Sequence, residues 1–327
     1  MNETAKRVFV TRMIPDTAIT MLRARGYVVD IFPKDRQPSH RELSKILARG
    51  SYDAVLCLLT DTIDAAIFDA APTVKLYVNY ATGFDNIDVA EAGKRGIVVA
   101  NSPAERSSEA VAEHTIALAF ALAARIVEAD EFVRRGKYTG WAPMNFIGTD
   151  VLGKTLGLVG AGRIGSRVGF YARALGMKVV YYDVKRNEQV EKECGAEFRA
   201  SPEDVIREAD IVSLHVPLLD STHHLINADR LALMKPTAFL VNTSRGPVVD
   251  EAALTAALRA KKIGGAALDV FEYEPRLVRG LAALQNVILT PHIASASIEA
   301  RTEMAEIAAR NIIDFFDGKT PAHTVTH

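Results

Sequence analysis

The stretch 160–165 (GAGRIG) constrains the fold most, because regular structure is predicted on both sides of it. The apolar run 155–159 comes directly before it and predicts a buried strand, whereas 166–175 has the pattern of a helix. A second apolar strand, 179–182, follows and ends in Asp183. Strand, glycine turn, helix, strand and acid in this order predict a βαβ unit that binds a dinucleotide.

Each glycine of this turn has a physical task in such a unit. Gly160 lets the chain turn sharply off the strand, Gly162 lets a pyrophosphate approach the backbone, and Gly165 lets the helix pack closely on the strand. The N–H groups at the start of that helix, around Arg163 and Ile164, then face the phosphates. The alternative is an ordinary tight turn between a strand and a helix.

Asp183 lies 18 residues after the last glycine of the turn, where a carboxylate accepts hydrogen bonds from the adenosine ribose and repels a 2′-phosphate. We therefore predict NAD rather than NADP as the cofactor, although Lys185 and Arg186 are close enough in sequence to neutralise a 2′-phosphate. His215 and Pro217 follow a later strand and are predicted to wall the adenine pocket. For all of these, the alternative is a plain turn at the end of a strand.

Composition argues against several classes of protein. The 327 residues include 39 basic and 40 acidic ones, a formal net charge of −1, so we expect no general attraction to nucleic acid or to an anionic membrane. The longest apolar stretch, 116–124, is too short to span a bilayer, and the N-terminus lacks the apolar core of a signal peptide. The cysteines and histidines show no metal-ligand spacing. We predict a cytoplasmic protein without a metal.

Strands and helices alternate along both halves of the chain, which predicts an α/β fold with parallel sheets covered by helices. The predicted strands are 8–11, 27–32, 54–59, 76–79 and 97–100, then 155–159, 179–182, 211–215, 239–242, 266–270 and 287–290. The six later strands match a doubly wound Rossmann domain. The long helix predicted from Ile298 to Phe316 is expected to return the chain to the first domain. We therefore expect an NAD-binding Rossmann domain, 103–294, inserted into a discontinuous flavodoxin-like substrate domain, 1–102 and 295–327.

Residues 107–133 predict one helix that is apolar on nearly every face. A helix of this kind must be buried on all sides, which happens between domains, at a subunit interface or within a single core. We predict that it forms the interface of a homodimer.

Reactive side chains follow three predicted strands of the second domain: Arg245, Glu274 and His292. Because ligands of open α/β sheets bind outside the carboxyl ends of the strands, the three are predicted to converge beside the cofactor. A guanidinium binds a carboxylate with two hydrogen bonds, a histidine exchanges a proton near neutral pH, and a neighbouring carboxylate fixes its tautomer. This set suits hydride transfer to a 2-keto acid. Taken singly, the three are also compatible with a surface ion pair, a solvated acid and a structural histidine.

Over nearly its whole length the chain resembles the D-isomer-specific 2-hydroxyacid dehydrogenases. The motifs that carry the resemblance are 81–88 (ATGFDNID), 242–246 (NTSRG), 269–275 (DVFEYEP) and 290–295 (TPHIAS). The resemblance implies that Arg245 anchors the substrate, that His292 is the general acid and base, and that Glu274 is its partner. It also implies that backbone N–H groups near Thr82 and Gly83 hold the substrate carboxylate, and that Asp269 and Thr243 lie by the nicotinamide.

Within the family, the chain is most similar to the glyoxylate and hydroxypyruvate reductases, through 9–15 (FVTRMIP), 140–143 (GWAP) and 269–276 (DVFEYEPR). Many of those reductases have Ser-Arg where this chain has Asp183-Val184, and they prefer NADPH, a preference that Asp183 argues against here. The resemblance implies the reduction of glyoxylate or hydroxypyruvate to glycolate or D-glycerate. Two alternatives stay open. One is another acid of the same class, such as phosphoglycerate, D-lactate or a bulkier keto acid, and the other is an NAD-sensing protein like the corepressors of this fold.

Overall fold

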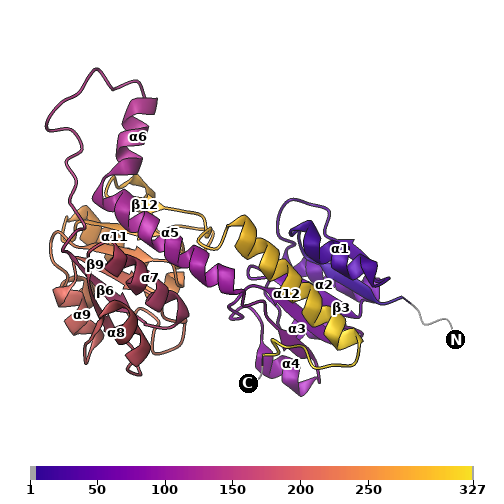
Figure 1. Cartoon of the computed structure of the whole chain (residues 1–327). Helices are drawn as coiled ribbons and strands as arrows, with labels where there is room; N and C mark the ends of the chain where they lie inside the picture. The colour runs from indigo at the N-terminus through magenta and orange to yellow at the C-terminus, as the bar shows by residue number, and fades with distance from the viewer. Residues whose placement is uncertain (1–4, 326–327) are drawn as a thin grey trace. The chain divides into compact units, whose positions relative to one another are not determined.

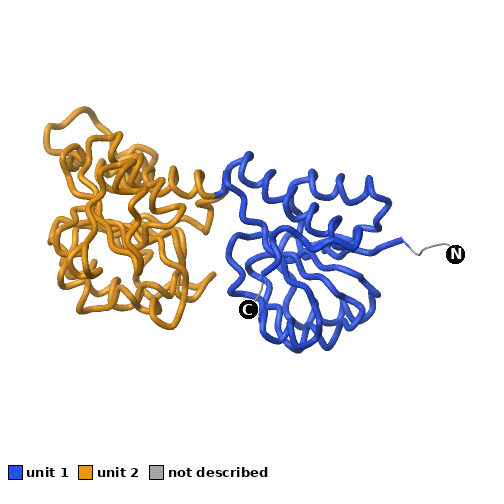
Figure 2. Tube along the Cα trace, turned by 60° about the horizontal axis from the view of Figure 1, so that its bottom comes forward, with its two compact units in different colours: residues 1–107, 296–327 blue, residues 108–295 orange. Residues whose placement is uncertain are grey.

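A computed structural model describes residues 5–325, which form two compact units (Figure 2). Unit 1 contains the chain up to Ser107 and again from Ala296 onward, and unit 2 contains Ser108–Ser295. The chain therefore leaves unit 1, builds unit 2 as one continuous segment, and returns to unit 1.

Unit 1 has a five-stranded parallel sheet in the order β2-β1-β3-β4-β5, the strand order of flavodoxin-like domains. The unit is covered by helices and closed by the C-terminal helix α12 (Figure 1). Its elements are β1 (Arg7–Val10), α1 (Asp16–Ala24), β2 (Val28–Ile31), α2 (His40–Gly50), β3 (Ala54–Leu58), α3 (Ala65–Ala70), β4 (Leu76–Tyr80), α4 (Val89–Lys94), β5 (Val98–Ala100) and α12 (Ile298–Phe316).

Helix α12 returns the chain to unit 1 because one of its faces carries small and apolar residues. Met304, Ala308 and Ile312 are buried in the same core as β1, β3 and β4, and the Tyr80 hydroxyl donates to the Arg301 carbonyl at 2.6 Å. The prediction of a returning helix over 298–316 is confirmed, with the same bounds.

Unit 2 has a seven-stranded parallel sheet in the order β12-β11-β10-β9-β6-β7-β8. The strand order reverses at β6, and β9 lies on its other side, which is the switch point where doubly wound sheets bind ligands. The elements are α5 (Glu105–Ala123), which begins in unit 1, then α6 (Ile126–Arg134), β6 (Thr155–Val159), α7 (Arg163–Ala174), β7 (Lys178–Tyr182), α8 (Glu188–Cys194), β8 (Glu197–Phe198), α9 (Pro202–Glu208), β9 (Ile211–Leu214), α10 (Ala228–Leu231), β10 (Phe239–Asn242), α11 (Glu251–Arg259), β11 (Gly265–Leu268) and β12 (Val287–Leu289), with 3-10 turns at Gly246–Val248 and Leu281–Ala283.

Alternate residues of these strands enter two different cores, because successive side chains of a strand point to opposite faces. In β7, Val179 and Tyr181 lie in one core with α5 and α7, whereas Val180 lies in the other with α9. Both faces of the sheet are therefore buried, which explains the nearly continuous apolar runs in the sequence. The predicted α/β class with a doubly wound sheet is confirmed.

The prediction of six strands in the later sheet was wrong by one. This sheet has a seventh strand, β8, whose two residues are too few for a readable pattern.

The predicted single helix over 107–133 was also wrong, because the chain bends by 66° between α5 and α6. Arg125 stands at the break with a left-handed φ of 55°, and its guanidinium pairs with Glu128 at 2.5 Å. Helix α5 buries Leu118 and Leu122 in the core of unit 2, but α6 has no buried residue and projects from the unit (Figure 1). Within 5–325, no single helix is long and apolar enough to cross a membrane. The bent pair α5 and α6 reaches the required length and apolar composition only when the two helices are taken together.

Candidate active site

The glycine turn after β6 has the geometry of a phosphate cradle. Gly160 has a φ of 98°, and a Cβ there would lie 2.6 Å from the His215 carbonyl oxygen, so no other residue fits. A Cβ on Gly165 would overlap the Gly160 carbonyl oxygen, whereas a Cβ on Gly162 would meet no atom within 4 Å. The first and third glycines are thus needed for packing within the protein, and the second leaves room for something outside it. This is the shape that a pyrophosphate requires at the start of α7, where Arg163 is the first helical residue.

Asp183 lies beside this cradle, directly after β7. Its Oδ2 accepts a hydrogen bond from the N–H of Ala161 at 2.8 Å, which fixes the carboxylate against the glycine turn. Arg186 turns to Glu191, with Nε–Oε1 and Nη2–Oε2 distances of 2.7 and 2.8 Å, while Lys185 is exposed. The Asp183 carboxylate is therefore held at the glycine turn, while the Arg186 guanidinium is engaged by Glu191.

His215 and Pro217 follow β9 on the other side of the cradle. The Nε2 of His215 lies 2.9 Å from the Ser213 hydroxyl, and burial lowers the pKa of His215 to about 3, so the ring is neutral at pH 7. The Pro217 carbonyl accepts from the Thr222 hydroxyl at 2.6 Å, which closes the turn. The backbone of His215 lies next to the glycine turn, since its carbonyl oxygen is within 2.6 Å of where a Cβ on Gly160 would stand. Their contact with adenine stays a prediction.

The turn after β10 presents Arg245. Asn242 organises this turn, since its Nδ2 donates to the Arg245 carbonyl at 3.0 Å and its Oδ1 accepts from the Ser244 N–H and hydroxyl. The Arg245 guanidinium, in turn, donates to the Ser244 carbonyl at 2.9 Å. A Cβ on Gly246 would overlap the Phe271 carbonyl oxygen, so this turn packs directly against the loop after β11. The predicted site residue Thr243 is buried, and its hydroxyl lies 2.9 Å from that of Thr115 on α5.

His292 and Glu274 form a hydrogen-bonded pair. The Nδ1 of His292 lies 3.0 Å from Glu274 Oε2, while Glu274 Oε1 accepts from the Phe271 N–H at 2.9 Å. The two side chains are 28 % and 31 % exposed, so the pair is reachable from solvent. With Nδ1 donating to the carboxylate, Nε2 is the ring nitrogen that can serve a substrate. Arg245, Glu274 and His292 follow β10, β11 and β12, which are neighbours in the sheet, so all three residues come after its carboxyl edge.

Asp269 holds the loop that carries His292. Its buried carboxylate accepts from the Thr290 hydroxyl at 2.6 Å and from the N–H groups of Ile293 and Ala294 at 2.9 and 2.8 Å, and His114 Nε2 lies 3.6 Å away. Burial alone raises a carboxyl pKa, but these hydrogen bonds outweigh it and lower the pKa of Asp269. The bracing matters because His292 itself has a φ of 55°, a conformation that a histidine rarely adopts. The predicted contact of Asp269 with the nicotinamide stays a prediction.

Three residues of this site were not predicted from the sequence: Asn242, His114 and Thr290. His114 had a signal, since it is a histidine within the otherwise apolar helix α5. Asn242 and Thr290 stand at the very ends of predicted strands, where a polar residue is also common without any function.

Thr82 and Gly83 lie in unit 1, in the loop after β4. Asparagine side chains hold their carbonyl groups, because Asn101 Nδ2 donates to Thr82 at 2.7 Å and Asn79 Nδ2 donates to Gly83 at 2.8 Å. Asn86 braces the same loop, since its Oδ1 lies 2.9 Å from the Nδ2 of Asn79. The loop therefore has a fixed shape within its unit.

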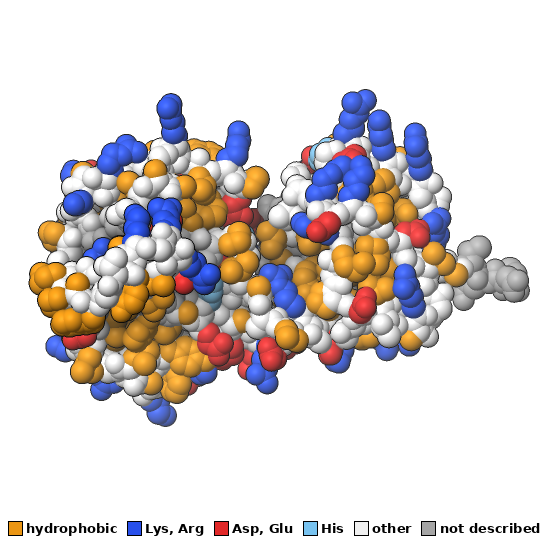
Figure 3. Space-filling view, turned by 90° about the horizontal axis from the view of Figure 1, so that it is seen from above, with side chains coloured by type: hydrophobic (Ala, Val, Ile, Leu, Met, Phe, Trp, Pro, Cys, Tyr) orange, Lys and Arg blue, Asp and Glu red, His pale blue; other side chains and the backbone are white. Residues whose placement is uncertain are grey.

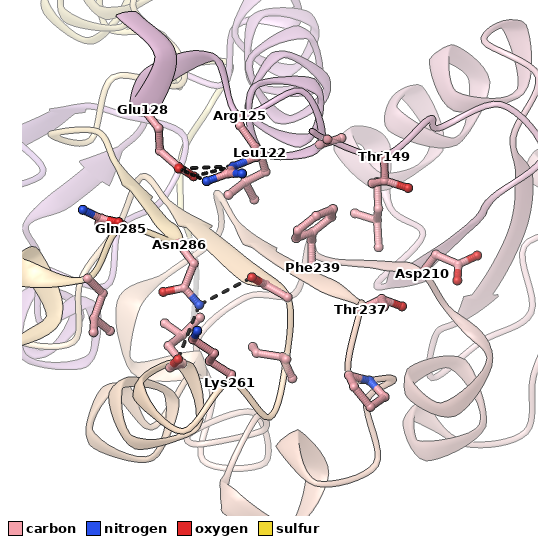
Figure 4. A pocket seen from close by; sticks show the side chains of 18 of the residues that line it. Leu122, Arg125, Glu128, Thr149, Asp210, Thr237, Phe239, Lys261, Gln285 and Asn286 are labelled. Carbon is pink, nitrogen blue, oxygen red and sulfur yellow. Dashed lines mark hydrogen bonds and ion pairs between the residues drawn. The ribbon is translucent and has the colours of Figure 1, made fainter. Parts of the chain in front are cut away.

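A hollow of about 750 Å³ lies elsewhere in unit 2, at the amino ends of the strands (Figure 4). It is lined by residues that precede or begin β9, β10 and β12, such as Asp210, Phe239 and Asn286, with the Arg125–Glu128 ion pair above them. Because all the predicted site residues of unit 2 follow the carboxyl ends of strands or begin a helix there, this hollow is separate from the candidate site. Within 5–325, no three His, Cys, Asp or Glu side chains are grouped in a way that would hold a metal ion.

The fold and these contacts define a class, the dinucleotide-binding α/β proteins with a hydrogen-bonded histidine–glutamate pair at the carboxyl edge of the sheet. Residues 116–294 match the family described as "D-isomer specific 2-hydroxyacid dehydrogenase, NAD binding domain". A glyoxylate reductase of Thermococcus kodakarensis is 47% identical over 319 residues, which cover 96% of this chain and 94% of that protein. The chain belongs to the D-isomer-specific 2-hydroxyacid dehydrogenase family, as its motifs predicted.

Solved structures agree with this placement. The TT0316 protein from Thermus thermophilus is 40% identical with a TM-score of 0.91, over 98% of this chain and 100% of that one. A D-lactate dehydrogenase from Aquifex aeolicus, complexed with NAD and lactic acid, is 30% identical with a TM-score of 0.83, over 96% of each chain. An NADPH-dependent glyoxylate/hydroxypyruvate reductase from Sinorhizobium meliloti is 27% identical with a TM-score of 0.84, over 98% and 97%. A nicotinamide dinucleotide is therefore the cofactor of this family, and both NAD and NADP occur among its members.

Proposed function

We propose that this protein is an NADH-dependent reductase of small 2-keto acids that converts glyoxylate or hydroxypyruvate to glycolate or D-glycerate. The observation that carries the proposal is the His292–Glu274 pair, with 3.0 Å between Nδ1 and Oε2, next in the sheet to the turn of Arg245. The 47% identity to a glyoxylate reductase over nearly the whole chain supports the choice of keto acid.

Arg245, His292 and Glu274 have different roles in the proposed reduction. Arg245 binds the substrate carboxylate, since a guanidinium offers two parallel N–H donors to it. His292 holds a proton on Nε2 and gives it to the carbonyl oxygen as the keto carbon is reduced, while Glu274 keeps the ring oriented and stabilises its protonated form. The reduced nicotinamide, when bound, supplies the hydride. The protein then has to take up one proton at His292 for each hydroxy acid that it releases.

NAD, rather than NADP, is the cofactor that we propose. Asp183 supports this choice, because its carboxylate is fixed at the glycine turn by the Ala161 N–H and would repel a 2′-phosphate. The pairing of Arg186 with Glu191 supports it too, because that guanidinium is already engaged by a carboxylate. Gly160, Gly162, Gly165 and the start of α7 would hold the pyrophosphate.

The roles proposed for Thr82 and Gly83 rest on the resemblance to the family and on the fixed shape of their loop. We expect their backbone N–H groups to bind the substrate carboxylate. Replacing Gly83 by proline would remove one of these donors, and we expect it to raise KM for glyoxylate while leaving the affinity for NADH unchanged. An unchanged KM would rule out that role for Gly83.

A homodimer is also part of the proposal. Helix α6 has no buried residue, although three of its side chains are apolar: Ile126, Val127 and Val133 are 55%, 49% and 56% exposed. In the loop that follows, Trp141 and Met144 are 82% and 76% exposed. Figure 3 shows hydrophobic side chains gathered on unit 2 in the view from above. So much exposed apolar surface on one projecting segment is typical of a protein interface. We infer that a second copy of the chain covers it.

The oligomeric state can be tested by multi-angle light scattering at micromolar concentration. We expect a dimer for the wild type and a monomer for the double variant Ile126→Glu/Val133→Glu. Glu131→Gln, on the same helix, is the matched control and should stay dimeric. A monomeric wild type would refute the dimer.

We also keep the prediction of a cytoplasmic location, which the two free and buried cysteines, Cys57 and Cys194, support.

The reaction itself is tested by measuring kcat/KM with glyoxylate, hydroxypyruvate, pyruvate and a bulkier keto acid, each with NADH and with NADPH. We expect glyoxylate and hydroxypyruvate, each with NADH, to give the highest kcat/KM. A clear preference for the bulkier acid would move the protein to another activity of the same class. No turnover with any pair, despite NADH binding, would favour an NAD-sensing role and overturn the proposal.

A further inference from the structure

The loop that carries Glu274 is held at both ends by one buried carboxylate. Tyr273, Glu274, Pro275 and Arg276 are exposed, so contacts with a core do not fix this part of the loop. Glu274 must nevertheless keep its Oε2 within 3.0 Å of the His292 ring. The residues on either side of the exposed segment therefore decide where Glu274 stands.

Glu251 makes the contacts on both sides. It is the first residue of α11 and only 2% exposed. Its Oε2 accepts from the Glu272 N–H at 2.9 Å and its Oε1 accepts from the Val278 N–H at 2.6 Å. The two oxygens of one carboxylate thus join the beginning and the end of the loop, and Glu274 lies between the joined points.

The Glu272 carboxylate in turn contacts both the backbone of Glu251 and the side chain of His224. Its Oε2 accepts from the Glu251 N–H at 3.0 Å, and its Oε1 lies 2.7 Å from His224 Nε2. Burial alone raises the pKa of a carboxyl group, but the hydrogen bonds from His224, the Glu251 N–H and Tyr273 outweigh it and lower the pKa of Glu272. Two nearly buried acids therefore sit side by side, each receiving the other's backbone N–H.

An ordinary role at the start of a helix does not account for Glu251. The N-terminus of α11 is already capped by Asp250, whose Oδ1 accepts from the Ala253 N–H at 2.8 Å. The Glu251 carboxylate instead points away from its own helix and accepts from two N–H groups of another loop. Helix α11 begins six residues after Arg245, beyond the 3-10 turn Gly246–Val248, so Glu251 joins the Glu274 loop to the segment that follows the Arg245 turn.

We propose that Glu251 is a positioning residue for the acid–base pair, which clamps the 272–278 loop at both ends and so sets the place of Glu274 beside His292. The inference rests on the proposed function, since it requires that the pair transfers a proton during reduction. Displacements of about 1 Å at a reacting group lower rates by about 100-fold. Loss of the clamp should therefore lower kcat, with little effect on cofactor binding at the far glycine turn.

The experiment compares Glu251→Ala, Glu251→Gln and wild type in glyoxylate reduction with NADH. We expect kcat to fall about 10- to 100-fold for Glu251→Ala and less for Glu251→Gln, which retains one carbonyl acceptor, while KM and the Kd of NADH stay within about twofold. Asp210→Ala is the matched control. Asp210 also accepts a backbone N–H, from Thr155 at 2.9 Å, but at the amino edge of the same sheet, so kcat should be nearly unchanged.

A double-mutant cycle separates positioning from general loss of structure. If Glu251 acts through Glu274, then Glu251→Gln added to Glu274→Gln should lower kcat no further. Additive losses in the cycle would overturn the inference, and so would a wild-type kcat in Glu251→Ala. Should Glu251→Ala fail to fold, the cycle with the milder Glu251→Gln decides between the two outcomes. Absence of turnover in the wild type would instead refute the proposed function, and the inference with it.

Discussion

Alanine substitutions at Gly162 and Gly165 test the phosphate cradle, because the structure predicts opposite costs for two glycines of one motif. A Cβ on Gly162 meets nothing within 4 Å, and its φ is −72°, which any residue adopts. A Cβ on Gly165 falls closer than 3.0 Å to the Gly160 carbonyl oxygen, so α7 has to move away from β6. Gly162→Ala should therefore affect only the ligand, whereas Gly165→Ala should also affect the fold.

The magnitudes follow from these contacts. Overpacking costs about 1–3 kcal/mol, and the overlap with a backbone oxygen places Gly165→Ala in the upper part of that range, about 2–3 kcal/mol. Alanine regains about 1 kcal/mol over glycine within a helix, so the net loss of stability should be about 1–2 kcal/mol. In a unit of this size that is a decrease in Tm of about 2–8 °C. Gly162→Ala should stay within about 0.5 kcal/mol of wild type. Its methyl group keeps the pyrophosphate from one or two charge-assisted hydrogen bonds, about 3 kcal/mol, which raises the Kd of NADH by about 100-fold.

Scanning calorimetry gives the Tm, and quenching of protein fluorescence by NADH gives the Kd. The expected pattern is a normal Tm with a raised Kd for Gly162→Ala, and changes in both for Gly165→Ala. Gly93→Ala is a suitable control, because a Cβ there also meets nothing within 4 Å and the residue lies in unit 1. A wild-type Kd in Gly162→Ala would refute the assignment of the cradle. Equal losses of Tm in both variants would refute the packing argument.

Further predictions concern single side chains. Asp183→Ala should raise the ratio of kcat/KM with NADPH to that with NADH by about tenfold or more, because the charge that repels a 2′-phosphate is gone; an unchanged ratio would exclude Asp183 from cofactor choice. Arg245→Lys should raise KM for glyoxylate about 10-fold or more, since the paired N–H donors are lost, and saturation kinetics check this. Glu274→Gln should lower kcat about 10- to 100-fold at an unchanged Kd for NADH, and an unaltered kcat would remove Glu274 from the mechanism. Burial lowers the pKa of His215 to about 3 in the folded protein, whereas the value in the unfolded chain is about 6.5. Between these two pH values only the unfolded chain binds the proton, so the free energy of unfolding decreases as the pH falls below about 6.5. Urea unfolding at pH 7.5 and 5.5 should therefore show a loss of up to about 1.4 kcal/mol that His215→Gln lacks, and the same loss in both proteins would contradict a neutral His215 ring in the folded protein.

The sequence predicts the fold well wherever burial dictates a periodic pattern. Strands such as Thr155–Val159 and Phe239–Asn242 are buried on both faces, so their apolar runs stand out and end where the strands end. The bend after α5 has no such signal, because Arg125 adopts the left-handed conformation without a glycine or proline nearby. The two-residue strand β8 is too short to produce a pattern at all.

The placement of the candidate site residues after adjacent strands could be predicted from the sequence, but the residues that hold their loops could not. Arg245, Glu274 and His292 are recognisable because the carboxyl ends of adjacent parallel strands meet at one edge. Glu251, in contrast, looks like any acid in the first turn of a helix, where it favours the helix dipole. Only the three-dimensional structure shows that its carboxylate points to another loop. Residues that act through hydrogen bonds to backbone groups leave almost no pattern in the sequence.

The central claim is that His292 gives the proton that accompanies reduction of a small keto acid by NADH. The most direct test measures NADH oxidation with saturating glyoxylate in the wild type and in His292→Asn, together with the Kd of NADH for both. The account predicts turnover in the wild type, and a kcat lower by about 100- to 10,000-fold in the variant with NADH still bound normally. Turnover in the variant that equals that of the wild type would contradict the account.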